Sequence, residues 1–165
     1  MMRMRSKPYG LLLAMLLLAS DAGGQKKYTG PKPPKPDHPY LQHADTLLPT
    51  EASQAREQAA KDEIRYVVAG ASSSARTPLA SPVLLLQAAE LAPDKLELYR
   101  LQSRAGEREV VFSKKNKKND PRPLRLSVAS LGDSLYRIEV DESLAAGEYS
   151  LTPSGSNQVF CFQVY

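Results

Sequence analysis

Leu-Arg-Leu-Ser-Val-Ala-Ser-Leu-Gly-Asp-Ser-Leu-Tyr-Arg-Ile-Glu-Val, residues 124–140, is the stretch that decides the fold class. Its apolar residues fall at every second position in both halves, at Leu124, Leu126, Val128, Tyr136, Ile138 and Val140. This period of two is typical of strands with one buried and one wet face. Gly132 and Asp133 in the short connector favour a tight turn. The stretch therefore predicts two antiparallel strands that pair as a hairpin.

Similar short apolar runs lie on both sides of this hairpin, separated by Gly, Pro, Ser, Asn and Asp. Such spacing is typical of an all-β sandwich. Since one core takes on the order of 100 to 150 residues, the chain has room for one domain and some tail. We predict a single β-sandwich over residues 64–165, with about seven to eight short antiparallel strands. The expected strands are 64–68, 83–87, 96–101, 109–113, 124–130, 135–140, 148–152 and 159–164.

Residues 1–22 have the pattern of a cleavable signal peptide. Three basic residues precede an apolar run over 11–19, and small residues follow it up to Ala22. Because a helix needs about 20 apolar residues to cross a bilayer, a run of about 10 is too short for an anchor. We therefore expect export to the periplasm or the outside of the cell, with no transmembrane span after cleavage.

The net charge of the chain bears on the partners it can bind, and its cysteine count limits the disulfides it can form. Cleavage would remove three basic residues and one acidic residue, so the formal charge of +4 would fall to +2. Such a charge does not indicate a nucleic-acid partner.

Cys161 is the only cysteine and cannot form a disulfide within the chain. Its apolar setting, Val-Phe-Cys-Phe, favours a buried and inert thiol.

Two segments precede the predicted sandwich. Residues 23–45 are rich in Pro, Gly and Lys, which predicts a disordered Pro/Lys-rich tether with little apolar surface to bury. Residues 46–63 contain strong helix formers, with Thr50 as an N-cap and Glu57 four residues before Lys61. They predict a short surface helix.

The segment Leu144-Ala-Ala-Gly-Glu-Tyr149 places a Leu, a turn Gly and a Tyr at the start of a strand. It resembles the tyrosine corner of immunoglobulin-like and fibronectin type III sandwiches, in which the Tyr hydroxyl bonds to nearby backbone. The resemblance implies structural roles for Leu144, Gly147 and Tyr149. With the last strand, residues 80–165 are similar to the C-terminal sandwich of exported bacterial proteins of unassigned function. This implies an immunoglobulin-like fold and no particular activity.

The sequence offers little for catalysis, cofactors or metals. His38 and His43, with two nearby aspartates, match no familiar zinc spacing. There is no Gly-x-Ser-x-Gly elbow and no phosphate-binding Gly-rich loop. We predict no catalytic, cofactor-binding or metal-binding residue, and no cofactor.

One charge cluster stands out in the loop between two predicted strands. From Ser113 to Arg125 there are six positive charges and one negative charge. Such a loop can contact anionic polymers or lipid headgroups. Lysines between strands also prevent edge pairing, and no aromatic residue lies among them to add stacking, so we favour a soluble loop. The residues that would make the anionic contact are Lys114, Lys115, Lys117, Lys118 and Arg122.

Two classes of function stay open. The preferred one is an exported, non-catalytic binding or structural module of the cell envelope or secreted fraction. Its partner would be an anionic envelope polymer or another envelope protein. The alternative is an exported enzyme whose site is built from residues scattered through the sequence.

Overall fold

The computed structural model describes residues 27–115 and 117–165. The signal peptide predicted for residues 1–22 therefore lies outside the described residues, as do residues 23–26 of the predicted tether. Within the described part of the chain there are thirteen strands, one short 3₁₀ turn (Pro93–Lys95) and no α-helix. No helix of that part is long and apolar enough to cross a membrane. The all-β prediction is confirmed.

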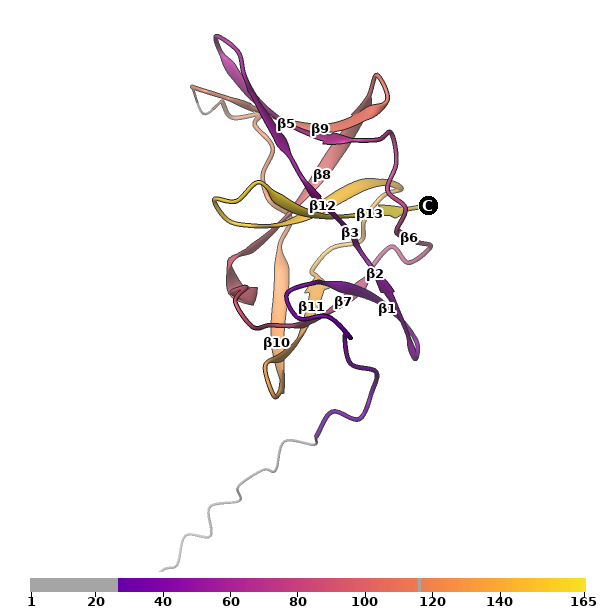
Figure 1. Cartoon of the computed structure of the whole chain (residues 1–165). Helices are drawn as coiled ribbons and strands as arrows, with labels where there is room; N and C mark the ends of the chain where they lie inside the picture. Colours follow the sequence, from indigo (N-terminus) through magenta and orange to yellow (C-terminus); the bar gives the residue numbers. More distant parts are fainter. Residues whose placement is uncertain (1–26, 116) are drawn as a thin grey trace, which may run out of the picture.

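The strands form two sheets in a sandwich-like arrangement (Figure 1). The five-stranded sheet is antiparallel, in the order β10 (Leu126–Gly132), β11 (Leu135–Val140), β7 (Val83–Gln87), β1 (Tyr40–His43) and β2 (Thr46–Pro49). The eight-stranded sheet runs β3 (Glu51–Gln54), β13 (Gln158–Val164), β12 (Gly147–Pro153), β8 (Leu96–Arg104), β9 (Glu107–Ser113), β5 (Glu63–Ala69) and β4 (Arg56–Ala59). The short strand β6 (Arg76–Thr77) pairs in parallel with β13.

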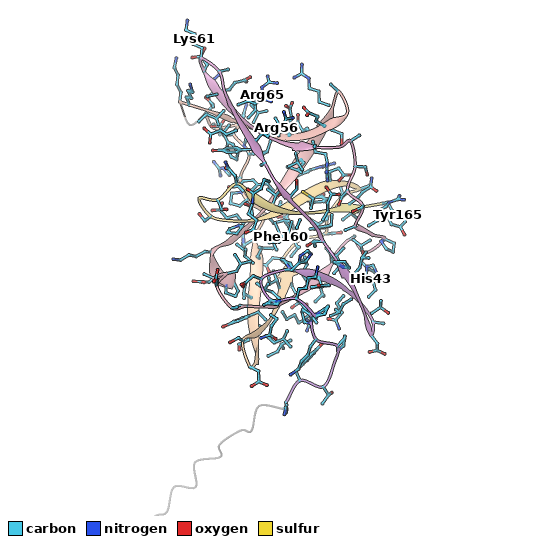
Figure 2. The ribbon with its side chains drawn as sticks, in the orientation of Figure 1. His43, Arg56, Lys61, Arg65, Phe160 and Tyr165 are labelled. Atoms are coloured by element: carbon cyan, nitrogen blue, oxygen red, sulfur yellow. The ribbon has the colours of Figure 1, made fainter. Side chains whose placement is uncertain are left out.

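The main core lies between the two sheets. Leu84 and Leu86 of β7 and Ile138 of β11 face Leu98 of β8 and Phe160 of β13, and all five are almost fully buried. Figure 2 shows Phe160 in the interior, whereas Lys61 lies at the tip of the β4–β5 turn. Side chains from the inner faces of two sheets form such a core because successive residues of a strand point to opposite faces.

A second core explains why the last strand, β13, is apolar on both faces. The outer faces of β8 and β13 are covered as well, by β5, by β9 and by Ala55 between β3 and β4. In β13, Phe160 and Phe162 enter the main core while Val159 and Cys161 enter the second one. The buried residues of the second core are Ala55, Val68, Leu101, Val110, Val159 and Cys161.

The eight-stranded sheet encloses this second core by curling on itself. Its two edge strands, β3 and β4, are consecutive in the chain and are separated only by Ala55. One extended segment therefore closes both edges, and Figure 1 shows it crossing in front of β12 and β13. The backbone N–H of Ala55 donates to the Asn157 carbonyl at 2.8 Å, which holds the segment to the β12–β13 turn.

All eight strands predicted over residues 64–165 are present, with ends that differ by three residues at most. β10 and β11 form the predicted hairpin. Gly132, Asp133 and Ser134 all have positive φ in its turn, a conformation that Gly and Asp adopt readily.

The helix predicted for residues 46–63 is wrong, because these residues form β2, β3, β4 and the start of β5. Glu51 and Ser53 are half-buried while Ala52 and Gln54 are exposed, a strand alternation that helix propensity does not report. Pairing with β13 and β5 satisfies the backbone and outweighs a preference of a few tenths of a kcal/mol per residue.

The predicted end of the tether at residue 45 is also wrong, and so is the start of the sandwich at residue 64. β1 lies between β7 and β2 inside the five-stranded sheet, and Tyr40 and Leu41 are buried. Asp37 has a φ of +54°. Its carboxylate accepts hydrogen bonds from the backbone N–H groups of Ala89, Glu90 and Leu91 at 2.8 to 3.0 Å. The Pro-rich composition of residues 23–45 did not reveal these hydrogen bonds, because a single side chain, the Asp37 carboxylate, accepts all of them.

Candidate functional site

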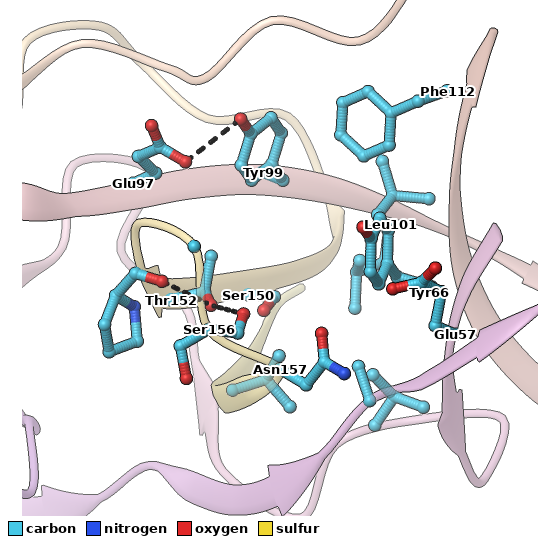
Figure 3. A pocket seen from close by; sticks show the side chains of 16 residues that line it. Glu57, Tyr66, Glu97, Tyr99, Leu101, Phe112, Ser150, Thr152, Ser156 and Asn157 are labelled. Carbon is cyan, nitrogen blue, oxygen red and sulfur yellow. Dashed lines mark hydrogen bonds between the residues drawn. The ribbon is translucent and has the colours of Figure 1, made fainter. Parts of the chain in front are cut away.

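A pocket of about 370 Å³ opens at one end of the second core (Figure 3). β8 supplies one wall, since Glu97, Tyr99 and Leu101 occupy alternate positions and point into it. Leu96 and Leu98, which alternate with them in sequence, belong to the main core. The strand period of two thus divides one sequence, Leu-Glu-Leu-Tyr-Arg-Leu, between a structural face and a pocket face.

Three aromatic rings line the pocket in a row across neighbouring strands. Phe112 of β9 lies between Tyr99 of β8 and Tyr66 of β5. The Tyr99 and Phe112 ring centroids are 5.6 Å apart with planes at 88°, and those of Tyr66 and Phe112 are 5.9 Å apart with planes at 75°. These edge-to-face contacts stabilise the row by roughly 0.5 to 1.5 kcal/mol per pair. We call Tyr66, Tyr99 and Phe112 the aromatic row.

A carboxylate accompanies the tyrosine at each end of the aromatic row. The Tyr99 hydroxyl donates to Glu97 Oε2 at 3.2 Å. Burial, together with the Glu97 charge, raises the pKa of Tyr99 to about 12. At the other end Glu57 of β4 lies directly opposite Tyr66 in the strand register. Burial and then the Glu57 carboxylate raise the pKa of Tyr66, so both phenols are neutral at physiological pH.

The wall facing the aromatic row is the β12–β13 turn. Thr152, Ser156 and Asn157 line the pocket there, as Figure 3 shows. The Thr152 hydroxyl donates to the Gln158 carbonyl at 2.6 Å, which ties the two ends of the turn together. Among the sixteen residues that line the pocket there are two carboxylates and no Lys, Arg or His. The pocket therefore combines apolar walls with a net negative charge.

Apolar side chains close the bottom of the pocket. The side chains of Val68, Leu101, Val110 and Val159 line its inner end and belong to the second core.

Cys161 lies in the same core and is fully buried, as its sequence setting predicted. Burial raises the pKa of the Cys161 thiol to about 11, although the Arg108 charge opposes this. The thiol is therefore protonated and a poor nucleophile at neutral pH.

A buried ion cluster closes the opposite end of the second core. Arg108 of β9 is 1% exposed, and its Nη2 donates to Glu51 Oε1 at 2.6 Å and to the Ala69 carbonyl at 2.7 Å. Its Nε donates to the Gly70 carbonyl at 2.9 Å. Glu148 of β12 lies 3.7 Å from Nη1, which has no hydrogen-bond partner among the described residues.

This cluster joins four elements that are distant in sequence. Glu148 also accepts from the Ser72 hydroxyl at 2.8 Å and the Ser73 N–H at 3.0 Å. Glu51 accepts from the Ser74 N–H at 2.8 Å. A buried charge pair stabilises little relative to apolar residues, but removing one partner costs about 3–5 kcal/mol. Its role here is to position the segment over residues 69–74 against β3 and β12.

The residues of the predicted tyrosine corner lie together at the crossover from β11 to β12. The buried Tyr149 hydroxyl donates to the Ala145 carbonyl, four residues upstream, at 2.7 Å. Leu144 is buried in the main core. Gly147 lies beside Arg100, whose guanidinium nitrogens would be 3.2 Å from any Cβ at that position. These residues hold the main core and do not line the pocket.

The basic loop lies away from the pocket, between β9 and β10. Asp120 braces it by accepting from the Ser113 N–H at 3.1 Å and the Lys117 N–H at 2.9 Å. Lys115 Nζ is 3.9 Å from an Asp62 carboxylate oxygen. Asp62 of the neighbouring β4–β5 turn thus lies beside the loop and lowers its local positive charge. Its five predicted contact residues, Lys114, Lys115, Lys117, Lys118 and Arg122, are all exposed.

The two histidines are used for local hydrogen bonds. His38 Nε2 lies 2.9 Å from the Thr50 carbonyl, and His43 Nε2 lies 2.9 Å from the Thr77 hydroxyl. Within residues 27–115 and 117–165 no three His, Cys, Asp or Glu side chains are grouped so that they could hold a metal ion.

Sequence reasoning missed the pocket and the ion cluster. Each aromatic residue lies in a strand that was predicted, so alternation could have assigned Tyr66, Tyr99 and Phe112 each to one face of its own strand. Alternation does not show which strands are neighbours. The closure of the second core also depends on β3 and β4, which were predicted as helix.

Comparisons of the chain with protein-family models, with curated proteins and with solved structures give no match.

Proposed function

We propose that this protein is an exported, non-catalytic binding module built on an immunoglobulin-like sandwich. Its ligand site is the pocket at the open end of the second core. The observation that carries this proposal is a preformed cavity of about 370 Å³ with aromatic and apolar walls and a few polar groups. Pockets that bind small molecules typically have this size and this lining.

The strand order supports the immunoglobulin-like assignment. In that fold, strands A, B, E and D form one sheet, while C, F and G, with C′ in variable-type domains, form the other. The order β1–β7–β11–β10 in one sheet and β9–β8–β12–β13 in the other corresponds to A-B-E-D and C′-C-F-G. Tyr149 lies near the start of the strand that corresponds to F, where the tyrosine corner is found. Strands β2 to β6 are then an insertion between the first two strands.

Export is the part of the proposal that rests on residues 1–22 alone. Secretion of the full chain by its native cells should yield a protein that begins at Gly23. N-terminal sequencing checks this, and a protein that still begins at Met1 would contradict it.

The binding role is tested by a fragment screen on isotope-labelled protein, followed by amide and ring-proton chemical shifts. Fragments should shift signals of Tyr66, Tyr99 and Phe112 together. Phe112→Leu should weaken these shifts. Tyr165→Leu should not, because Tyr165 is 60% exposed and lies outside the pocket. Shifts that cluster elsewhere, or none at all, would contradict the proposed site. Chemical conversion of a bound fragment would instead favour the exported-enzyme hypothesis.

A further inference from the structure

We propose that the pocket binds an organic cation, specifically a methylated or quaternary ammonium group. This inference rests on the proposed function and adds the chemical class of the ligand. It uses four features of the pocket: the sign of its charge, the chemistry of the aromatic row, the polar and apolar groups of the lining and the angles between the rings.

The charge of the lining selects the sign of the ligand. Glu57 and Glu97 are the only ionisable side chains apart from the two tyrosines among the sixteen lining residues. An anionic ligand would lose hydration beside two carboxylates with no positive partner, which is costly in a site with apolar walls. A cation is complementary to the same lining.

The aromatic row supplies the second contribution. Aromatic faces attract cations through the ring quadrupole, and quaternary ammonium ligands are held by such clusters of rings. The hydrogen bond from Tyr99 to Glu97 increases the electron density of the phenol ring, and this strengthens the attraction. Glu57 lies directly opposite Tyr66 in the strand register, at the other end of the row. The carboxylates thus attract a cation by their own charge, and Glu97 also strengthens the attraction between the cation and the Tyr99 ring.

The polar and apolar groups of the lining favour a methylated ammonium over a primary one. A primary ammonium has three N–H donors that must each find an acceptor when buried. Glu57, Glu97 and the Thr152 hydroxyl keep lone pairs that could accept from it. Among the described residues Glu97 accepts only from Tyr99, and the Thr152 hydroxyl only donates. The preference therefore rests on desolvation, because a primary ammonium is strongly hydrated and loses that hydration beside the apolar walls. A quaternary group has no donors to satisfy and keeps its charge, so the apolar walls suit its methyl groups.

The ring angles argue against a neutral sugar. A pyranose packs its flat face on a flat aromatic platform. Neighbouring planes in the aromatic row are turned by 75° and 88°, so they form no common platform. A sugar ligand is therefore an outcome that the experiment must be able to detect.

The test compares choline with its uncharged carbon isostere, 3,3-dimethyl-1-butanol, in a titration followed by the ring protons of the aromatic row. The two probes have the same shape and differ in charge. Choline should bind at least about tenfold more tightly. Glu97→Gln keeps an acceptor for Tyr99 but removes one charge, so it should weaken choline several-fold and leave the isostere unchanged. Tyr165→Leu is the matched control and should change neither.

Phosphatidylcholine vesicles and the disaccharide maltose complete the experiment. Sedimentation with the vesicles would assign the ammonium group to a lipid headgroup, whereas binding of free choline alone would assign it to a soluble ligand. Equal affinity for choline and its isostere, or tighter binding of maltose, would overturn the cation inference and leave the binding module standing. Fragments that bind while choline does not would do the same. If nothing binds in the pocket, both proposals fail.

Discussion

At the scale of single residues, Tyr149 ties the crossover between the two sheets to the main core. Tyr149→Phe removes the hydrogen bond to the Ala145 carbonyl and should lower the free energy of unfolding by about 1 kcal/mol, or up to about 3 if the carbonyl is left unpaired. Tyr149→Ala removes a ring that is 2% exposed and stacks on Phe162, so we expect a loss of roughly 3–5 kcal/mol.

Urea denaturation measures both losses, and Tyr165→Phe provides the exposed control. Surface substitutions usually change stability by less than about half a kcal/mol, so the control should keep the wild-type midpoint. If Tyr149→Phe and Tyr149→Ala also kept it, the role of Tyr149 in the crossover would be refuted.

Two carboxylates make stability depend on acid pH. Desolvation would raise the pKa of Glu51, but hydrogen bonds from Arg108 and the Ser74 N–H outweigh it and lower that pKa below its ordinary 4.5. For Asp37, partial burial is likewise outweighed by the N–H groups of Ala89, Leu91 and Glu90, which lower its pKa below 3.8. A lowered pKa in the folded state gives stability that is complete above the ordinary value and is lost as pH falls through the folded value.

We therefore expect the free energy of unfolding to fall as the pH is lowered from about 5 towards 2. Asp37→Asn and Glu51→Gln should each reduce stability at neutral pH and flatten this acid decline. Urea melts at a series of pH values measure the slope. A slope that both variants share with the wild-type protein would show that these carboxylates do not carry the pH dependence.

At the scale of elements, residues 46–59 are the segment on which both sheets depend. They pair with β1, then with β13 at one edge of the eight-stranded sheet, and then with β5 at the other edge. They also supply Glu51 to the buried Arg108. Without this segment the second core would open to solvent and Arg108 would lose its closest carboxylate.

A chain that begins at residue 64 should therefore fail to fold, although it contains every strand that alternation predicts. We expect it to show no cooperative urea transition by circular dichroism and poorly dispersed amide signals. A chain that begins at residue 27 is the control and should unfold cooperatively. Cooperative unfolding of the shorter chain would mean that strands β1 to β4 are dispensable.

At the scale of the whole molecule, the two cores share strands β8 and β13. β8 and β13 each bury one face in the main core and the other in the second core, while β12 contributes Tyr149 and Leu151 to the main core and its buried Ser150 lines the pocket on the other face. The second core cannot lose its packing without exposing the backs of strands that also hold the first. The molecule should therefore unfold as one unit rather than as two layers.

Cys161 allows this to be measured, because it is fully buried in the second core and the pKa of its thiol is raised to about 11. In rising urea, thiol alkylation and the loss of circular dichroism should share one midpoint. Alkylation at urea concentrations that leave the circular dichroism native would show that the second core opens separately.

Alternation and turn residues predicted eight of the nine strands β5 to β13, because most of them bury an apolar side, but not the two-residue β6. Alternation did not predict the strands within residues 40–59, since β1, β3 and β4 have only four residues each, β1 follows a Pro-rich stretch, and β3 and β4 are rich in helix formers. Nor did it reveal the pocket. Tyr99 and Phe112 could be assigned to faces but not to neighbouring strands.

What the sequence determined by itself is therefore local: the all-β class, eight strands, the β10–β11 hairpin and a buried Cys161. Tertiary structure decided that residues 46–59 form β2, β3 and β4. It also decided that Arg108 meets Glu51 and Glu148, and that three aromatic rings lie in a row with a carboxylate at each end. The physical reason is that the alternation of apolar and polar side chains can be recognised within the sequence of each strand. Its hydrogen-bonding partners and the closure of a curled sheet depend on segments far away in the chain.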